Sequence, residues 1–352
     1  MLSQIGLPEI IAGIMVVALN AYVLMGGADF GGGVWDLLAR GPRRLRQRTL
    51  IANSIAPIWE ANHVWLIVVV VMLFTAFPLA FNELGIVLHI PLTIMLIGIV
   101  LRGTAFVFRS YGGEGPARAR WGVTFAVAST ITPLILGMTI GALASGAVGD
   151  ASRAVSAGSF AAVYVQPWLG LFPIAIGLMA LSLFAFLAAV YLAHASTDAD
   201  LREDFRLRAL GAAVAVFAFA AIGLIVAMRS APIMAGALLA TGWALVLHVV
   251  IGASATTAIW ALWTRRFGLA RVAAAAQVSL ILWGWVFAQY PYILPTSMRI
   301  RDAAAPRITL ELLLGGLIAG ALILIPSLRY LLRTFAPAHP SSRSSTRNSK
   351  AP

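Results

Sequence analysis

The chain has 352 residues, of which 61% are hydrophobic and only 11% are charged. A soluble protein carries about a quarter of its residues as charged side chains, because polar groups must cover its surface. The composition therefore excludes a water-soluble or disordered protein, and the absence of cysteine excludes a disulfide-stabilised secreted scaffold. Without cysteine, this chain also has no thiolate to ligate a haem or an iron–sulfur cluster.

Apolar runs of 18 or more residues recur along the chain, which is typical of helices that cross a membrane and not of a barrel. We predict an all-α integral membrane protein with about nine transmembrane helices. Several runs exceed the roughly 20 residues that cross a bilayer, so tilted helices are expected. In chain order, the predicted spans cover residues 8–38, 50–79, 84–109, 121–147, 165–194, 207–228, 232–262, 269–290 and 308–334.

The net charge of +12 comes from arginine clusters in the connections between these spans. One set of alternate connections, with the C-terminal tail, holds 19 of the 25 basic residues, and the other set holds five. By the positive-inside rule, the C-terminus is expected in the cytoplasm and the N-terminus outside. The first residues lack a basic segment and a cleavage site, so no cleaved signal peptide is expected. We predict a membrane domain over 1–334 and a disordered cytoplasmic tail over 335–352, which is rich in Ser, Pro and Arg.

Charged side chains inside the first and third spans are costly, at about 2.5–3.5 kcal/mol each on insertion scales. Asp29 and Asp36 lie seven residues apart on one helical face, and Arg102 and Arg109 have the same spacing. We predict that Arg102 and Arg109 form structural ion pairs at the level of the acids. Asp36, next to a basic loop, is expected to pair in solvent, whereas Asp29 suits a structural ion pair and a functional role equally.

The second predicted span places Glu60 and His63 three residues apart on one face. Glu60 lies about 15 Å into the helix at 1.5 Å per residue, where a carboxylate is either paired or protonated. Both states suit a proton relay, so we predict a proton path through Glu60, Asp29 and His63. His63 also suits a ligand or a satisfied interior histidine. Polar and aromatic residues accompany this pair: Asn53, Trp59, Asn62 and Trp65.

These segments resemble subunit II of the cytochrome bd-type quinol oxidases. The resemblance rests on G-A-D-F-G-G-G around Asp29, on N-S-I-A-P-I-W-E-A-N-H-V-W-L from residue 53 to 66, and on L-F-T-A-F-P from 73 to 78. L-R-G-T-A-F-V-F-R from 101 to 109 and Y-P-Y-I-L-P-T-S from 290 to 297 support it. The residues that match the family motif most specifically are Asn53, Pro57, Trp59, Asn62 and Trp65. Glu60, where Asp is common, and His63, where Gln or Glu is common, indicate a divergent branch.

The resemblance implies two four-helix bundles with one peripheral helix, in the bacterial cytoplasmic (inner) membrane. It implies an obligate heterodimer with a subunit I that carries two b-type haems and one d-type haem, with none bound by this chain. That complex would oxidise quinol and reduce dioxygen to water, and Glu60 aligns with a carboxylate on its cytoplasmic proton path. A small accessory subunit and contacts with quinone and membrane lipids are compatible with it. We expect the glycines within 26–33 to line the seam with subunit I.

Two other interpretations remain open. Buried Asp, Glu and Arg side chains also mark ion pathways, so a secondary transporter or proton antiporter is the main alternative. An autonomous haem protein would use His63 and His248, which are the only deep histidines. Co-elution with a larger haem-bearing chain separates all three.

Overall fold

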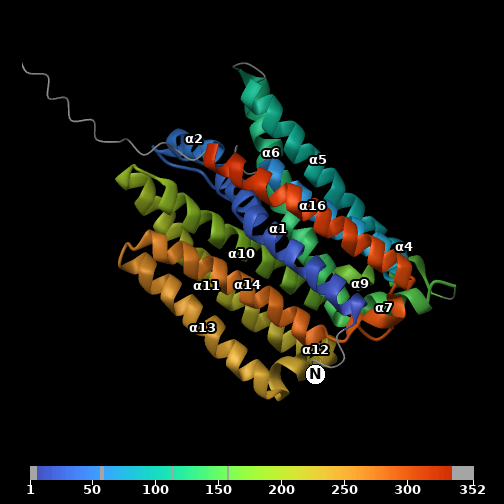
Figure 1. Cartoon of the computed structure of the whole chain (residues 1–352). Helices are drawn as coiled ribbons and strands as arrows, with labels where there is room; N and C mark the ends of the chain where they lie inside the picture. Colours follow the sequence, from blue (N-terminus) through green and yellow to red (C-terminus); the bar gives the residue numbers. More distant parts are fainter. Residues whose placement is uncertain (1–5, 56–58, 112–114, 157, 335–352) are drawn as a thin grey trace, which may run out of the picture. The chain divides into compact units, whose positions relative to one another are not determined.

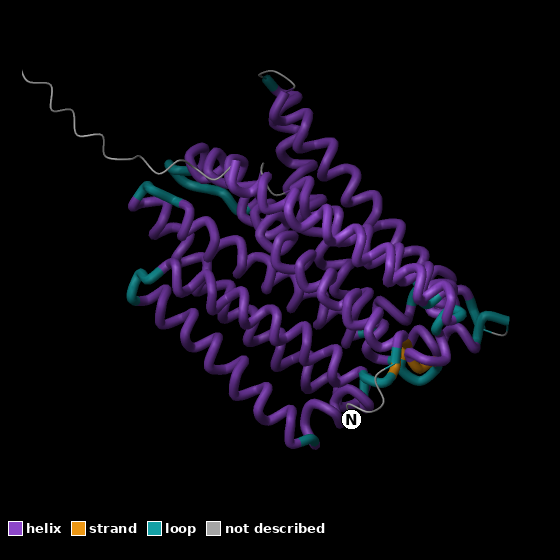
Figure 2. Tube along the Cα trace, viewed as in Figure 1, coloured by secondary structure: helices purple, strands orange, loops and turns teal. Residues whose placement is uncertain are grey.

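The structure is a computed structural model that describes residues 6–55, 59–111, 115–156 and 158–334. Side chains are not described at 55, 59–61, 110, 111, 325, 328 and 331–334. Almost every described residue is helical, and the strands form one short hairpin (Figure 2). Eight helices are long and apolar enough to cross a membrane, or up to nine if a sharply bent helix pair counts as one span. The predicted all-α membrane fold is therefore confirmed.

Four long helices of the N-terminal half pack together. They are α1 (Leu7–Leu37), α3 (Trp59–Ala76), α5 (His89–Tyr111) and α6 (Pro116–Ser145). In this group α1 packs against α3 and α6, and α5 packs against α6. The short helices α2 (Arg44–Ile55), α4 (Pro78–Val87) and α7 (Ala147–Arg153) complete this half.

The second half contains α10 (Leu171–Ala195), α11 (Ala199–Ser230), α13 (Gly242–Trp263) and α14 (Phe267–Gln289). Here α10 packs against α11 and α14, and α13 packs against α14. The two halves meet where α10 contacts both α1 and α6 (Figure 1). The shorter elements are α8 (Phe160–Tyr164), α9 (Gln166–Leu169), α12 (Pro232–Ala240), β1 (Tyr292–Leu294), β2 (Met298–Arg299) and α15 (Ile300–Ala303).

The last helix, α16 (Arg307–Thr334), belongs mostly to a separate unit. The first compact unit ends at Leu310, and the second begins at Glu311. The apolar part of α16 from Arg307 to Leu324 is long enough to span a membrane. The two-bundle arrangement and the tail over 335–352 stay predictions, and the tail lies outside the described residues.

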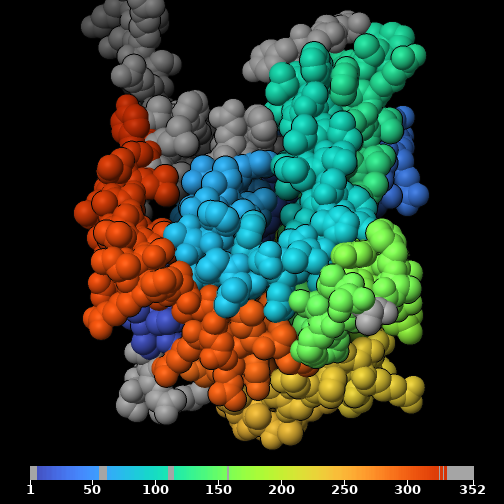
Figure 3. Space-filling view, turned by 90° about the vertical axis from the view of Figure 1, so that its right-hand side faces the viewer, coloured from blue at the N-terminus to red at the C-terminus, as the bar shows by residue number. Residues whose placement is uncertain are grey.

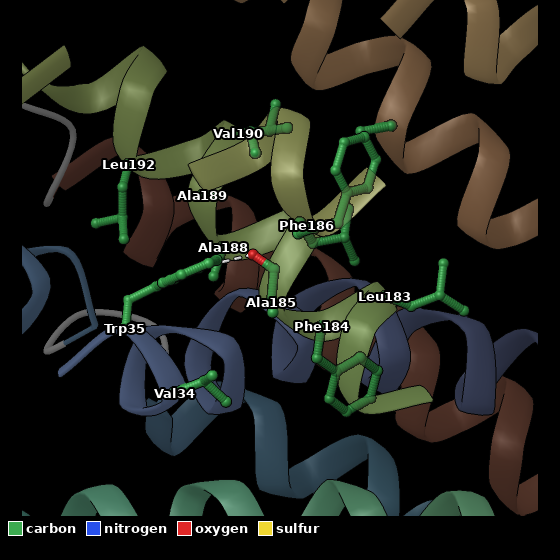
Figure 4. Packing of buried hydrophobic residues seen from close by; sticks show 14 of the residues in the cluster. Val34, Trp35, Leu183, Phe184, Ala185, Phe186, Ala188, Ala189, Val190 and Leu192 are labelled. Atoms are coloured by element: carbon green, nitrogen blue, oxygen red, sulfur yellow. Dashed lines mark hydrogen bonds between the residues drawn. The ribbon is translucent and has the colours of Figure 1, made fainter. Parts of the chain in front are cut away.

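The core lies along the contact between α1 and α10. Buried aromatic and aliphatic side chains of both helices fill it, as Figure 4 shows around Phe184 and Phe186. Trp35 of α1 reaches across to α10, where its indole Nε1 donates a hydrogen bond to the carbonyl oxygen of Ala185 at 2.8 Å. This bond satisfies the only polar atom of a side chain that otherwise packs as a hydrophobe.

The glycine-rich segment of α1 makes this core possible, and the expectation for it was wrong. A Cβ atom at Gly31 would overlap the backbone carbonyl of Phe184 in α10, and one at Gly33 would overlap the side chain of Ser129 in α6. The two glycines that open the segment are in close contact with α3 and α10 in the same way. These residues therefore form seams between helices of this chain, not with another subunit.

Two predicted spans are interrupted. The predicted span over 50–79 contains the end of α2 and all of α3, and the chain then bends by 113° between α3 and α4, at Phe77 and Pro78. Proline has no backbone N–H to continue the helical ladder, and it begins the next helix instead. The predicted span over 232–262 is divided at Thr241 into α12 and α13. Helix breaks between apolar segments leave little trace in hydropathy, because both sides remain apolar.

Candidate functional site

A buried ion pair joins α1 to α5. The Arg102 guanidinium donates through Nη2 to Oδ1 of Asp29, and the two side chains are 2% and 0% exposed. Arg102 Nε donates to the hydroxyl of Ser129 in α6 at 3.0 Å. The guanidinium also lies over the rings of Phe30 and Phe125, 4.5 and 5.3 Å from their centroids. Ion pairing, a hydrogen bond and cation–π contacts thus compensate this buried charge.

A second pair lies one heptad further along the same two helices. Arg109 donates to both carboxylate oxygens of Asp36, at 2.9 and 3.0 Å. Arg48 of α2 approaches the same carboxylate at 3.6 Å and donates to the Asp36 carbonyl oxygen at 3.2 Å. The carboxylate of Asp36 is 0% exposed, so the expectation that it pairs in solvent was wrong. The close packing of α1, α2 and α5 buries it.

The two oxygens of Asp29 are not equivalent. Oδ1 accepts from Arg102, whereas Oδ2 is buried and has no hydrogen-bond partner of normal geometry among the described residues. Asn62 of α3 is fully buried close to this carboxylate, and neither atom of its amide is hydrogen-bonded within the described part of the chain. His63 is near enough to interact with the Asp29 charge. The structure therefore brings Asp29, Arg102, Asn62 and His63 together.

The other predicted site residues are placed less closely. Glu60 and Trp59 lie in the first turn of α3, but their side chains are outside the described part of the structure, and so is the whole of Pro57. Asn53 is exposed at the end of α2 and Trp65 packs against the core from α3. Glu60 begins the helix that carries Asn62 and His63, which puts it on the element nearest to Asp29.

A cavity of about 580 Å³ borders the deep pair. Sequence reasoning missed it, because its walls come from α1, α2, α10 and α14, which are far apart in the chain. Among its polar lining residues are Tyr191, His194 and Arg271. A polar residue inside an apolar span, as Ser129 is, was the signal that could have located the Arg102 contact from sequence.

An ion-pair network holds α2 against the start of α11. Arg43, just before α2, donates through Nε to Asp204 at 2.9 Å, and Gln47 donates to the same carboxylate at 2.9 Å. The hydrogen bond to the Asp204 carboxylate raises the pKa of Arg43 above its ordinary value. Arg208 in turn donates to the Gln47 side chain at 2.8 Å. These contacts fix the helix that carries Asn53.

The two deep histidines are not brought together. His63 lies on α3, which packs mainly on α1, and His248 lies on α13, which packs mainly on α14. The Nδ1 atom of His248 is 2.6 Å from the carbonyl oxygen of Ala244 in its own helix. An axial histidine pair, as an autonomous haem protein would need, is therefore not formed by these residues.

Fold and site together define a polytopic helical membrane protein whose first, third and fifth helices meet at a buried charged layer. The profile of the family "Cytochrome bd terminal oxidase subunit II" matches residues 7–335. The chain therefore belongs to this family.

Individual relatives agree. The chain is 30% identical to cytochrome bd ubiquinol oxidase subunit 2 of Bacillus subtilis over 59% of its own length and 60% of that protein. It is 29% identical to cytochrome bd-I ubiquinol oxidase subunit 2 of Escherichia coli over 37% of its own length and 34% of that protein. These alignments span less than two thirds of the relatives. In fold, it is similar to a chain of the bd oxidase structure from Geobacillus thermodenitrificans, with a TM-score of 0.74, 22% identity, and coverage of 94% and 98%.

Proposed function

We propose that this chain is the subunit of a bd-type terminal oxidase that binds no haem, and that it supports a haem-bearing subunit I. Quinol oxidation and the reduction of dioxygen to water take place in that partner, which supplies two b-type haems and one d-type haem. The support is membership of the family, together with a chain that has no cysteine and whose deep histidines lie on separate helices.

The contribution of this chain to the chemistry is a proton path from the cytoplasm. Asp29, His63 and Glu60 carry it, with Arg102 as the permanent positive charge that holds Asp29 in place. The observation that carries this proposal is the buried Asp29 carboxylate, which is fixed through one oxygen and has the other available beside α3. A group of this kind can accept a proton without losing its position.

The test of the proton path is Glu60→Gln in the assembled complex. Quinol oxidase turnover should fall at least tenfold at unchanged haem content, because the amide keeps the shape and cannot exchange the proton. The matched control is Glu83→Gln on α4, whose carboxylate is exposed and accepts from Ser297 at 3.2 Å. Wild-type turnover in Glu60→Gln would remove Glu60 from the mechanism.

The test of the partnership is purification through a tag on this chain. A larger haem-bearing chain should co-elute, and this chain expressed alone should contain no haem. A stable, haem-replete preparation of this chain alone would overturn the proposal. A haem-free chain that moves protons or solutes across vesicles by itself would favour the transporter instead.

Orientation follows from the 19-to-5 distribution of positive charge, which puts the C-terminus and the Leu37 end of α1 on the cytoplasmic side. Reporter fusions measure it directly. A C-terminal fusion of a phosphatase that is active only outside the cytoplasm should be inactive, and a fluorescent protein at the same point should be bright.

A further inference from the structure

The cavity beside Asp29 has the geometry of a channel between four helices. On α10 its wall is formed by residues spaced three and four apart, which is one helical face: Ala188, Tyr191, Leu192 and Ala195. One end lies at His194 and Arg271, at the end of α10 and near the start of α14. The other end lies at Asp29, eight residues or about 12 Å before the end of α1.

The deep end of this cavity needs a hydrogen-bond donor. Asp29 lines the cavity, and its buried Oδ2 atom has no partner among the described residues. A buried carboxylate oxygen without a donor is costly, and a cavity of this size holds water when several polar groups face it. Asn53, Ser54 and Tyr191 supply such groups between the two ends.

We propose that this cavity is a water-filled inlet through which protons pass from the cytoplasmic rim to Oδ2 of Asp29. The inlet rests on the proposed function, because its rim is cytoplasmic only in the orientation given above. A proton that arrives along the water chain bonds to Oδ2, and the water that released it is left neutral. Asn62 and His63 of α3 lie near the same carboxylate, so the proton leaves toward the helix that carries Glu60.

The rim favours protons over metal ions. Arg271 faces it, and Arg202 of α11 acts on the same imidazole of His194, so a bare cation is repelled there. A proton passes because hydrogen-bonded groups exchange it, and the imidazole of His194 can accept one from solvent and release it inward. His194 is exposed, as a group that exchanges protons with the cytoplasm must be.

The chain has no cysteine, so a single introduced cysteine reports water access without background from this subunit. Ala275 lines the cavity, whereas its neighbour Ala274 is fully buried and does not. Val249 on α13 is 63% exposed and serves as a comparison on the outer, apolar surface. Each variant, Ala275→Cys, Ala274→Cys or Val249→Cys, is prepared as the assembled complex in membrane vesicles. A charged methanethiosulfonate reagent is added from one side, and labelling is read as the mass of this chain.

Ala275→Cys should be labelled at least tenfold faster than either comparison, and only from the cytoplasmic side. Its labelling should lower quinol oxidase turnover several-fold, while the same reagent leaves the wild-type complex unchanged. Labelling as slow as at Ala274 or Val249 shows a dry or lipid-filled cavity and overturns the inlet. Labelling from the outside, or full turnover after complete labelling, also overturns it. Failure of the proposed function is separate, because it shows as a wild-type chain that lacks a haem-bearing partner.

Discussion

The two ion pairs between α1 and α5 have the same spacing and different completeness. Asp29 with Arg102 and Asp36 with Arg109 are each separated by 73 residues in the chain. In the outer pair, both oxygens of Asp36 accept from Arg109, and Arg48 adds a third contact. In the deep pair, Arg102 binds one oxygen of Asp29 and uses its remaining capacity on Ser129.

This difference separates a structural pair from one that can also take part in chemistry. A carboxylate with both oxygens bound to arginine has little capacity to accept a proton, whereas the Oδ2 atom of Asp29 faces a cavity. The heptad spacing thus produces two similar contacts between the helices, and the surroundings give them different roles. Three substitutions test this contrast.

Arg102→Leu should have the largest effect. It leaves Asp29 buried without a cation, and breaking one partner of such a pair costs about 3–5 kcal/mol. We expect little assembled complex and a parallel loss of haem, measured by membrane immunoblot and the haem absorbance. The double variant Arg102→Leu with Asp29→Leu removes both charges and should recover part of the assembly. Normal assembly of the single variant at reduced turnover would instead give Arg102 a role in the proton path.

Arg109→Leu should destabilise less, by about 2 kcal/mol, because Arg48 remains beside Asp36 and the Arg109 side chain is 17% exposed. The measurement is the midpoint of thermal unfolding of the purified complex. Turnover per haem should be unchanged, since the outer pair has no part in proton transfer. A loss of turnover at full haem content would contradict the contrast between the two pairs.

Ser129→Ala should have the smallest effect, about 1 kcal/mol, through the loss of one hydrogen bond from Arg102 Nε. Ser129→Thr keeps a hydroxyl and serves as the control for the bond, although Gly33 leaves little room for an added methyl group. A shift in unfolding midpoint as large as that of Arg102→Leu would mean that Ser129 carries more of the deep pair than its single contact suggests.

Much of the fold could be predicted from the sequence, because long apolar runs have one physical explanation. The breaks at Pro78 and Thr241 could not, since the apolar segments on both sides read as one run. Helical periodicity gave no help either. In a membrane protein, the face toward lipid and the face toward the core are both apolar, so a helix such as α3 shows no polar side to distinguish them.

The pairing of acids with arginines could be anticipated from heptad spacing and sign, but the surroundings of each pair could not. The burial of Asp36 depends on α2 folding back over the end of α1, and the access of Asp29 to a cavity depends on α10 and α14. These are contacts between distant segments. Ser129 and His194 contribute to the site for the same reason, and only a structure assembles them.

The 73-residue separation of the paired charges also has a consequence for biosynthesis. At about 5–20 residues per second, α1 leaves the ribosome several seconds before Arg102 is made. During that interval Asp29 must enter the bilayer without its guanidinium, at a cost of about 2.5–3.5 kcal/mol on insertion scales. The apolar length of α1 is sufficient to bear this cost. The helix therefore waits in the membrane, close to the insertion machinery, until α5 arrives to close the first contact of the tertiary structure.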